Sequence, residues 1–270
     1  MNPWILLGTA ILLIALALWI PRFRLKRALS APFSDTWVEI LEQNIGVYRN
    51  LPMPLRLQLR QMIKQFLHQK QFFGAGGLAI DDEIRVTIAA QACMLQLNRS
   101  GGLYPRLKSI IVYPSAFVVE RAESDGSGVV SHGRKGLLGE SWQKGKVILA
   151  WDNVLHGARN FVDGRNVTLH EFAHQLDSET GSANGAPLLA GESSYRSWAA
   201  ALSDEFKSLQ RDAFRGRRSL LDHYGATNPA EFFAVATETF FEKPERMRKN
   251  HSELFEVLKS YYRADPSEWQ

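Results

Sequence analysis

Cysteine is almost absent from this sequence. Cys93 is the single cysteine among 270 residues, so no disulfide can form within the chain, and we expect it to be a core residue. Internal repeats and low-complexity stretches are also missing, and 45% hydrophobic with 22% charged residues is ordinary for a globular protein. These absences exclude a disulfide-stapled scaffold, a repeat array and a largely disordered chain. The length accommodates one domain of roughly 200 residues plus something small.

A strong excess of either charge is missing too, since the net formal charge is only +4. Two basic clusters, residues 22–27 and 211–218, carry much of the excess, and neither alternates repeatedly with aromatic residues as a nucleic-acid surface usually does. We interpret the first as a membrane flank and the second as a solvated loop or helix end. We therefore expect no direct nucleic-acid binding.

Residues 3–20 contain no charge, and this run is long enough to cross a bilayer core of about 30 Å. A cleaved signal peptide would have its positive residues before the run, whereas here they follow it. The positive flank predicts a single-pass anchor with the N-terminus outside and the rest of the chain in the cytoplasm. We divide the chain into a transmembrane anchor (1–21), a juxtamembrane linker with a lead-in helix (22–54) and a folded domain (55–270).

Hydrophobic periodicity predicts an α+β fold that is mainly helical with a small mixed sheet. A glycine-rich stretch, residues 73–77, lacks the Lys-Ser/Thr of a phosphate loop and does not follow a predicted strand, so we interpret it as a turn. Residues 123–139, including His132, read as a solvated hairpin loop. We expect helices at residues 37–45, 55–72, 82–97, 167–177, 195–214 and 229–242, and strands at 109–113, 116–119 and 147–151.

The chain is organised around the sequence V-T-L-H-E-F-A-H-Q-L-D at residues 167–177. On a helix, His170 and His174 lie one turn apart on the same face, so two ring nitrogens can reach one Zn²⁺ with Glu171 beside the open coordination position. Asn166 is a suitable N-cap, and apolar residues flank the pattern on both sides. A surface helix that carries two histidines by accident would not need a cap and apolar residues on both sides, so this context favours a metal site.

A catalytic zinc takes three protein ligands, so a third must come from elsewhere in the chain. Glu231 could instead be a capping carboxylate three residues after Asn228, and Glu238 lies two turns further along the same helix face. Periodicity alone leaves these two nearly tied. The full set of candidates is Asp177, Glu192, Asp222, His223, Glu231 and Glu238.

Several stretches together resemble the Mlc titration factor A family, glucose-regulated zinc metallopeptidases of bacteria whose catalytic core is similar to that of anthrax lethal factor. The resemblance covers roughly residues 55–265, although the soluble members of the family begin without a long apolar span. The stretches are F-F-G-A-G-G-L, R-V-T-I-A-A-Q-A-C, G-E-S-W, V-I-L-A-W, H-E-F-A-H-Q-L-D and Y-G-A-T-N-P-A-E-F-F-A-V.

This resemblance implies a zincin-like, gluzincin-type metallopeptidase domain with Zn²⁺ held by His170, His174 and Glu231, and with Tyr224 facing the metal. Glu171 is then the general base and Tyr224 the donor to the oxyanion. Glu238 is expected to hold a ligand imidazole. Asp177 either orients a ligand imidazole or only contacts the loop that follows its helix.

The leading hypothesis is thus a zinc peptidase on the cytoplasmic face of a bacterial inner membrane, acting on a peptide or protein. The strand at residues 147–151 is expected to bind an extended substrate by main-chain pairing. The alternative is a regulatory protein that sequesters an Mlc-like repressor, with catalysis secondary. A zinc hydrolase acting on something other than peptides is a third hypothesis.

Overall fold

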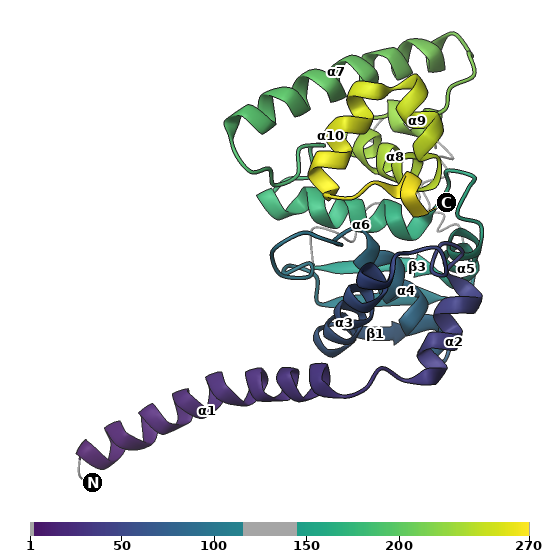
Figure 1. Ribbon diagram of the computed structural model, residues 1–270. Coiled ribbons are helices and arrows are strands. Elements are labelled where there is room, and N and C mark those ends of the chain that lie inside the picture. The colour runs from purple at the N-terminus through teal and green to yellow at the C-terminus, as the bar shows by residue number, and fades with distance from the viewer. Residues whose placement is uncertain (1–2, 116–144, 270) are drawn as a thin grey trace, which may run out of the picture.

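The computed structural model describes residues 3–115 and 145–269, and it is mostly helical (Figure 1). The predicted strand at 116–119 and the predicted loop with His132 lie outside these residues. A single sheet, β1 (Gln71–Gly74), β2 (Ser109–Tyr113) and β3 (Lys146–Ala150), is formed by the described residues. The helices are α1 (Pro3–Ser30), α2 (Asp35–Asn44), α3 (Met53–Gln69), α4 (Asp82–Met94), α5 (Trp151–Arg159), α6 (Val167–Asp177), α7 (Glu192–Phe214), α8 (Pro229–Glu242), α9 (Pro244–Asn250) and α10 (Ser252–Tyr262).

The sheet has the order β1-β2-β3, and both pairs of strands are parallel. The described residues therefore form a parallel sheet and not the expected mixed one. Strand β1 overlaps the end of the predicted helix at 55–72 and the start of the predicted glycine-rich turn, so the periodicity does not reveal it. The glycine-rich stretch thus lies between a strand and a helix, contrary to our expectation. Between β1 and β2 the chain crosses over through α4, as parallel pairing requires.

The motif helix α6 lies between two layers of the molecule (Figure 1). On one side are the sheet and the helices α3 to α5, and on the other side is the group α7 to α10, in which α8 packs against α6. The ring of Phe172 joins α6 to the sheet side, where its centroid is 4.9 Å from that of Tyr104 and 5.8 Å from that of Phe66. Leu41 of α2 is buried in the same hydrophobic core. The motif helix is therefore packed on both sides.

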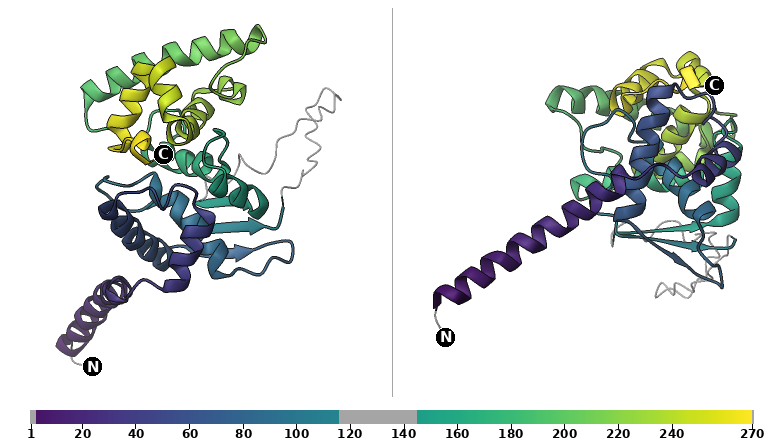
Figure 2. Two further views of the ribbon diagram at one scale, coloured as in Figure 1. Left: turned by 45° about the vertical axis from the view of Figure 1, so that its right-hand side comes forward. Right: turned by 60° about the horizontal axis from the view of Figure 1, so that its bottom comes forward.

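Helix α1 projects away from the rest of the molecule in every view of Figures 1 and 2, and none of its residues is buried. It is longer than the predicted span and continues through Pro21 and the basic flank. By length and composition it is able to cross a membrane. The ammonium group of Lys64 on α3 donates hydrogen bonds to the carbonyl oxygens of Leu29 and Ala31, so it ties the end of α1 to the folded domain.

Candidate metal centre

Helix α6 begins where its sequence predicts. The side chain of Asn166 accepts a hydrogen bond from the backbone N–H of Leu169 at 3.0 Å, which satisfies one of the free donors of the first turn. The same side chain donates to the carbonyl oxygen of Gly157 on α5 at 3.0 Å, so the cap also fixes the helix to its neighbour. The start of α6, and with it the position of His170, is set by local sequence.

Helix α8 supplies the carboxylate that faces the two histidines. Asn228 caps this helix by accepting a hydrogen bond from the backbone N–H of Glu231 at 3.0 Å, and Pro229 occupies its first turn. The carboxylate of Glu231 does not serve as a cap: its Oε2 lies 2.9 Å from Nε2 of His170 and 3.3 Å from Nε2 of His174. The cap of α8 thus aims Glu231 across to α6.

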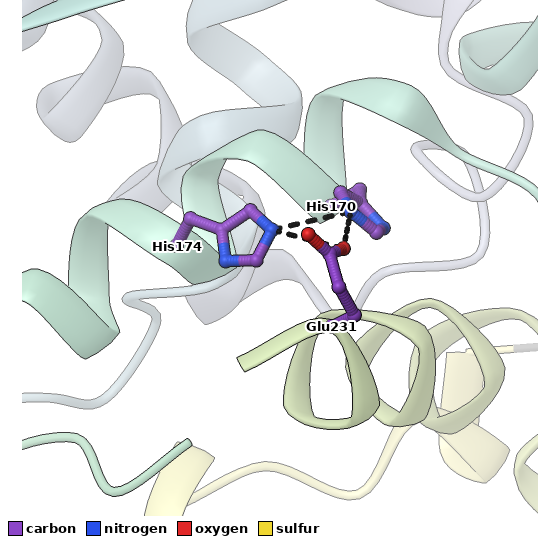
Figure 3. A group of neighbouring side chains, drawn as sticks. All are labelled: His170, His174 and Glu231. Atoms are coloured by element: carbon purple, nitrogen blue, oxygen red, sulfur yellow. Dashed lines mark hydrogen bonds and ion pairs between the residues drawn. The ribbon is translucent and has the colours of Figure 1, made fainter. Parts of the chain in front are cut away.

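The three side chains converge on one point (Figure 3). The Nε2 atoms of His170 and His174 are 3.2 Å apart, and the potential ligand atoms of the set all lie within 4.8 Å of one another. Two atoms bound to one tetrahedral zinc at about 2.0–2.1 Å are separated by about 3.3 Å. The observed separations therefore match three corners of a tetrahedral site. In the described parts of the chain, this is the only group of side chains with such an arrangement.

The hydrogen bonds of His170 require a positive charge at this point. Oε1 of Glu238 lies 2.7 Å from Nδ1 of His170, which assigns the proton of a neutral ring to Nδ1 and leaves Nε2 with a lone pair. That lone pair faces the carboxylate of Glu231, an acceptor, at 2.9 Å. Two acceptors repel at this distance unless a proton or a metal ion lies between them. The donor set therefore fits a cation.

The titration of the same groups agrees with this geometry. Burial alone would lower the pKa of His170, but its hydrogen bonds to Glu231 and Glu238 outweigh burial and raise the pKa to about 10. Burial would raise the pKa of Glu231, but the two histidines lower it to about 2. The pKa of His174 is lowered, mainly by burial. A proton on Nε2 of His170 thus supplies the positive charge that the Glu231 carboxylate requires, and the ring of His174 is neutral.

Glu171 lies on α6 between the two histidines and is 1% exposed. Its Oε2 is buried and has no hydrogen-bond partner among the described residues. Burial raises the pKa of Glu171 to about 8, opposed by the charge of His170. A buried carboxylate with an unused oxygen beside the cluster is well suited to exchange a proton with a bound molecule.

Tyr224 lies on the open side of the cluster. It belongs to a short 3₁₀ helix, His223–Ala226, whose start is fixed by Asp222, since the carboxylate accepts from the backbone N–H of Tyr224 at 2.9 Å. The ring centroid of Tyr224 is 5.9 Å from that of His170, and the side chain is 54% exposed. Burial of its hydroxyl, with the charges of Glu231 and Glu171, raises the pKa of Tyr224 to about 12. The hydroxyl keeps its proton at neutral pH and can donate it in a hydrogen bond.

The remaining candidates for the third ligand lie outside the cluster. Asp177 accepts a hydrogen bond from the backbone N–H of Gly185 at 2.7 Å and so contacts the loop after α6. Asp222 forms an ion pair with Arg165 at 3.3 Å. Glu192 and His223 are exposed. Among the residues considered from sequence, only Glu231 and Glu238 reach the histidines.

Sequence reasoning missed Glu242, which lies one turn after Glu238 on α8. Its Oε2 accepts hydrogen bonds from the backbone N–H groups of Gly164 at 2.7 Å and Arg165 at 3.1 Å. Glu238 accepts from the next N–H, that of Asn166, at 2.6 Å. Both carboxylates therefore hold the segment that leads into α6. The spacing of Glu231, Glu238 and Glu242 along one helix face was the available signal.

Two histidines one turn apart, a glutamate between them and a carboxylate from a neighbouring helix form the ligand pattern of a metallopeptidase. The comparison with known families identifies the same class: residues 20–263 match the model of the glucose-regulated metallo-peptidase M90 family. The chain belongs to this family, the family of Mlc titration factor A, and the predicted resemblance is confirmed. Membership implies a metal ion.

Individual relatives extend over most of the chain. This chain is 41% identical to the uncharacterized protein slr2042 of Synechocystis sp. The 245 aligned residues cover 90% of this chain and 89% of that protein. The chain is 31% identical over 216 residues to the Mlc titration factor A of Pectobacterium atrosepticum, covering 77% of this chain and 79% of the relative. The Mlc titration factor A of Yersinia pestis is 29% identical over 233 residues, with coverages of 85% and 84%.

Proposed function

We propose that this chain is a zinc-dependent peptidase of the gluzincin type, with His170, His174 and Glu231 as the metal ligands. The observation that carries the proposal is the convergence of these three side chains at separations that suit tetrahedral zinc. Imidazole and carboxylate ligands suit zinc, and the absence of thiolates from the set argues against a structural Cys-based site. A zincin-like fold is part of the same proposal.

The chemistry divides between the metal and two side chains. When bound, zinc supplies Lewis-acid chemistry, because it lowers the pKa of a bound water towards about 7 and polarises the scissile carbonyl. Glu171 takes the proton from the attacking water and passes it to the leaving amine, a task for which its unused buried oxygen is available. Tyr224 donates a hydrogen bond to the developing oxyanion.

The other side chains on α8 position the first ligand. Glu238 accepts a hydrogen bond from Nδ1–H of His170 and so leaves Nε2 to bind a metal. Glu238 and Glu242 also hold the segment before α6 through its backbone N–H groups. The helix that carries Glu231 thereby also fixes the helix that carries the two histidines.

We further propose that an extended substrate pairs with the outer edge of β3. Within the described parts of the chain no strand pairs with this edge, and α6 packs against β3. Unpaired main-chain groups beside the motif helix provide the hydrogen bonds that an extended peptide needs. A substrate whose amide donors are removed by N-methylation should then bind more weakly.

The peptidase is proposed to be tethered to a bacterial inner membrane through residues 3–20, with its site in the cytoplasm. Support comes from the length and exposure of α1 and from the basic residues that follow its apolar part. The chain would then act on peptides or proteins within reach of the membrane surface.

A second function, binding of an Mlc-like repressor, is favoured by the name of the relatives, Mlc titration factor A. Sequestration of a repressor does not require Glu171. The presence of Glu171 therefore favours catalysis over a protein that only binds. The two functions are compatible, and a chelator separates them: it should abolish peptide cleavage, whereas repressor binding that does not depend on the metal should persist.

The test of the peptidase proposal is metal analysis of the full chain purified in detergent, followed by hydrolysis of a chromogenic aminopeptide and an internally quenched longer peptide. We expect about one zinc per chain and hydrolysis that stops with a chelator and returns with zinc. A protein loaded with zinc that cleaves esters but neither peptide would favour a different hydrolase.

A further inference from the structure

The opposite edge of the sheet carries a second opening. Strand β1 is the edge strand furthest from α6, since the order is β1-β2-β3 and α6 packs against β3 (Figure 1). The backbone N–H of Gln71 donates to Lys108 at 3.0 Å and that of Ala75 donates to Val112 at 2.8 Å, so the odd-numbered residues of β1 face β2. By the alternation of a strand, the N–H and C=O groups of Phe72 and Gly74 point outward. Among the described residues neither forms a backbone hydrogen bond on that side.

A surface hollow of about 490 Å³ lies along this edge. Its walls are half apolar and half polar, and Phe73, which is 51% exposed, lines it. A guanidinium group, that of Arg85, stands over the ring of Phe72 at 5.9 Å and forms a long ion pair of 3.4 Å with Asp82. The lining residues are Lys70, Gln71, Phe72, Phe73, Ile80 and Arg85.

We propose that the β1 edge is a second peptide-binding site, which takes an extended protein segment with an acidic and an apolar side chain on the same face. The outward groups of Phe72 and Gly74 supply main-chain pairing, the hollow receives the apolar side chain, and Arg85 receives the carboxylate. This site lies across the sheet from the metal centre and does not depend on the proposed catalysis.

The charges at this edge select the occupant. The cationic side chains of Arg85 and Lys70 both line the hollow, and the ammonium of Lys70 donates to the carbonyl oxygens of Tyr104 and Leu107. Two copies of the chain that paired their β1 edges would bring these like charges together, which disfavours a second copy. The cationic residues could instead serve to prevent aggregation at an edge strand. That role does not require a hollow that receives a side chain, so the hollow favours binding.

The probe for this site is an end-blocked, fluorescent octapeptide with glutamate and leucine alternating at the odd positions and threonine at the even positions. Binding is measured by anisotropy to the full chain in detergent, with the Glu171→Gln substitution and a chelator present so that no cleavage occurs. Two further versions carry N-methyl groups on either the odd or the even amides, because a strand presents these amides on opposite edges. We expect one version to bind like the parent and the other to lose at least about tenfold in affinity.

Charge reversal supplies the matched variants. Arg85→Glu should lower the affinity for the acidic peptide about tenfold or more and raise the affinity for a version with lysine in place of glutamate. A glutamate is acceptable at this position because the first turn of α4 is already acidic. Arg196→Glu, on exposed surface of α7, should change neither affinity. Thermal melting of both variants checks their folding, and the lysine peptide tests the folded Arg85→Glu protein directly.

Three results would overturn the proposal. Equal binding of both N-methylated peptides would exclude strand pairing, and equal effects of the two arginine variants would exclude Arg85. In a repeat with zinc in place of the chelator and the Glu171→Gln substitution retained, displacement of the octapeptide by a substrate-like inhibitor of the metal centre would place it at β3 instead. Absence of peptidase activity, in contrast, would count against the proposed function and leave the β1 site unaffected.

Discussion

Glu238 and His170 form the contact that defines the candidate site: Oε1 of the carboxylate lies 2.7 Å from Nδ1 of the imidazole. Because this carboxylate accepts a hydrogen bond from Nδ1–H, the Nε2 atom is directed at Glu231 and at the Nε2 of His174. The same carboxylate accepts the N–H of Asn166 at the start of α6. One side chain of α8 therefore fixes both the ring orientation of His170 and the helix that carries it.

The roles of the two glutamates on α8 can be separated by metal content. Glu231→Ala removes a proposed ligand, and we expect most of the zinc to be lost on dialysis. Glu238→Ala removes only a partner of the His170 ring, so its zinc affinity should fall roughly 10–100-fold while most of the metal is retained at saturating zinc. Metal analysis after dialysis against graded zinc buffers measures both. If only the Glu238 variant lost its zinc, the third ligand would be Glu238 and not Glu231.

Tyr224 is expected to act on turnover and not on metal binding. Tyr224→Phe removes the hydroxyl that donates to the oxyanion, so kcat should fall by roughly 10²–10³-fold with little change in KM or zinc content. His223→Ala, an exposed neighbour in the same short helix, is the control and should keep normal turnover. Equal kinetics of the two variants would remove Tyr224 from the mechanism.

Burial of Glu242 makes stability depend on pH. Burial raises the pKa of Glu242 from its usual value of 4.5 to about 8, so the folded state holds this proton more tightly than the unfolded state does. The stabilising contribution is complete below about pH 4.5 and is lost as pH rises through about 8. Glu242→Gln should remove this dependence, so the stability of the wild type relative to the variant should decrease from pH 5 to pH 8.5.

Urea unfolding of both proteins across this pH range provides the measurement. The change should amount to a few kcal/mol at most, since one pKa unit corresponds to about 1.4 kcal/mol. A difference between the two proteins that is constant with pH would show that Glu242 is ionised in the folded state throughout.

Helix α2, the lead-in helix of the predicted segment 22–54, is expected to contribute to the stability of the domain. Leu41 is fully buried in the core that also contains Phe172 of the motif helix. Leu41→Ala should destabilise the protein by roughly 2–5 kcal/mol, the usual cost of such a cavity. Glu39→Ala, on the exposed side of the same helix, should change stability little. If Leu41→Ala is as stable as Glu39→Ala, α2 is only a connector.

The features that could be predicted from the sequence are those that local residues determine. The starts of α6 and α8 follow from Asn166 and Asn228, whose side chains cap those helices. The spacing of His170 and His174 requires only the geometry of one helix turn. The core position of Cys93 follows similarly from the apolar run around it, and the residue is buried.

The features that could not be predicted depend on contacts between distant segments. Glu231 and Glu238 lie on the same face of α8, so periodicity left them tied; what distinguishes them is which nitrogen of His170 each one meets. Strand direction in the sheet is likewise set by pairing between segments far apart in the chain. Strand β1 has only four residues and no alternating pattern strong enough to separate it from α3.

The central claim is that Glu171 exchanges the proton in a zinc-dependent cleavage of peptide bonds. The most direct test compares turnover of an internally quenched peptide by the wild type and by Glu171→Gln at equal, measured zinc content. We predict that the variant binds as much zinc as the wild type and loses roughly 10²–10⁴-fold or more in kcat. Turnover close to that of the wild type, at full zinc occupancy, would contradict the claim.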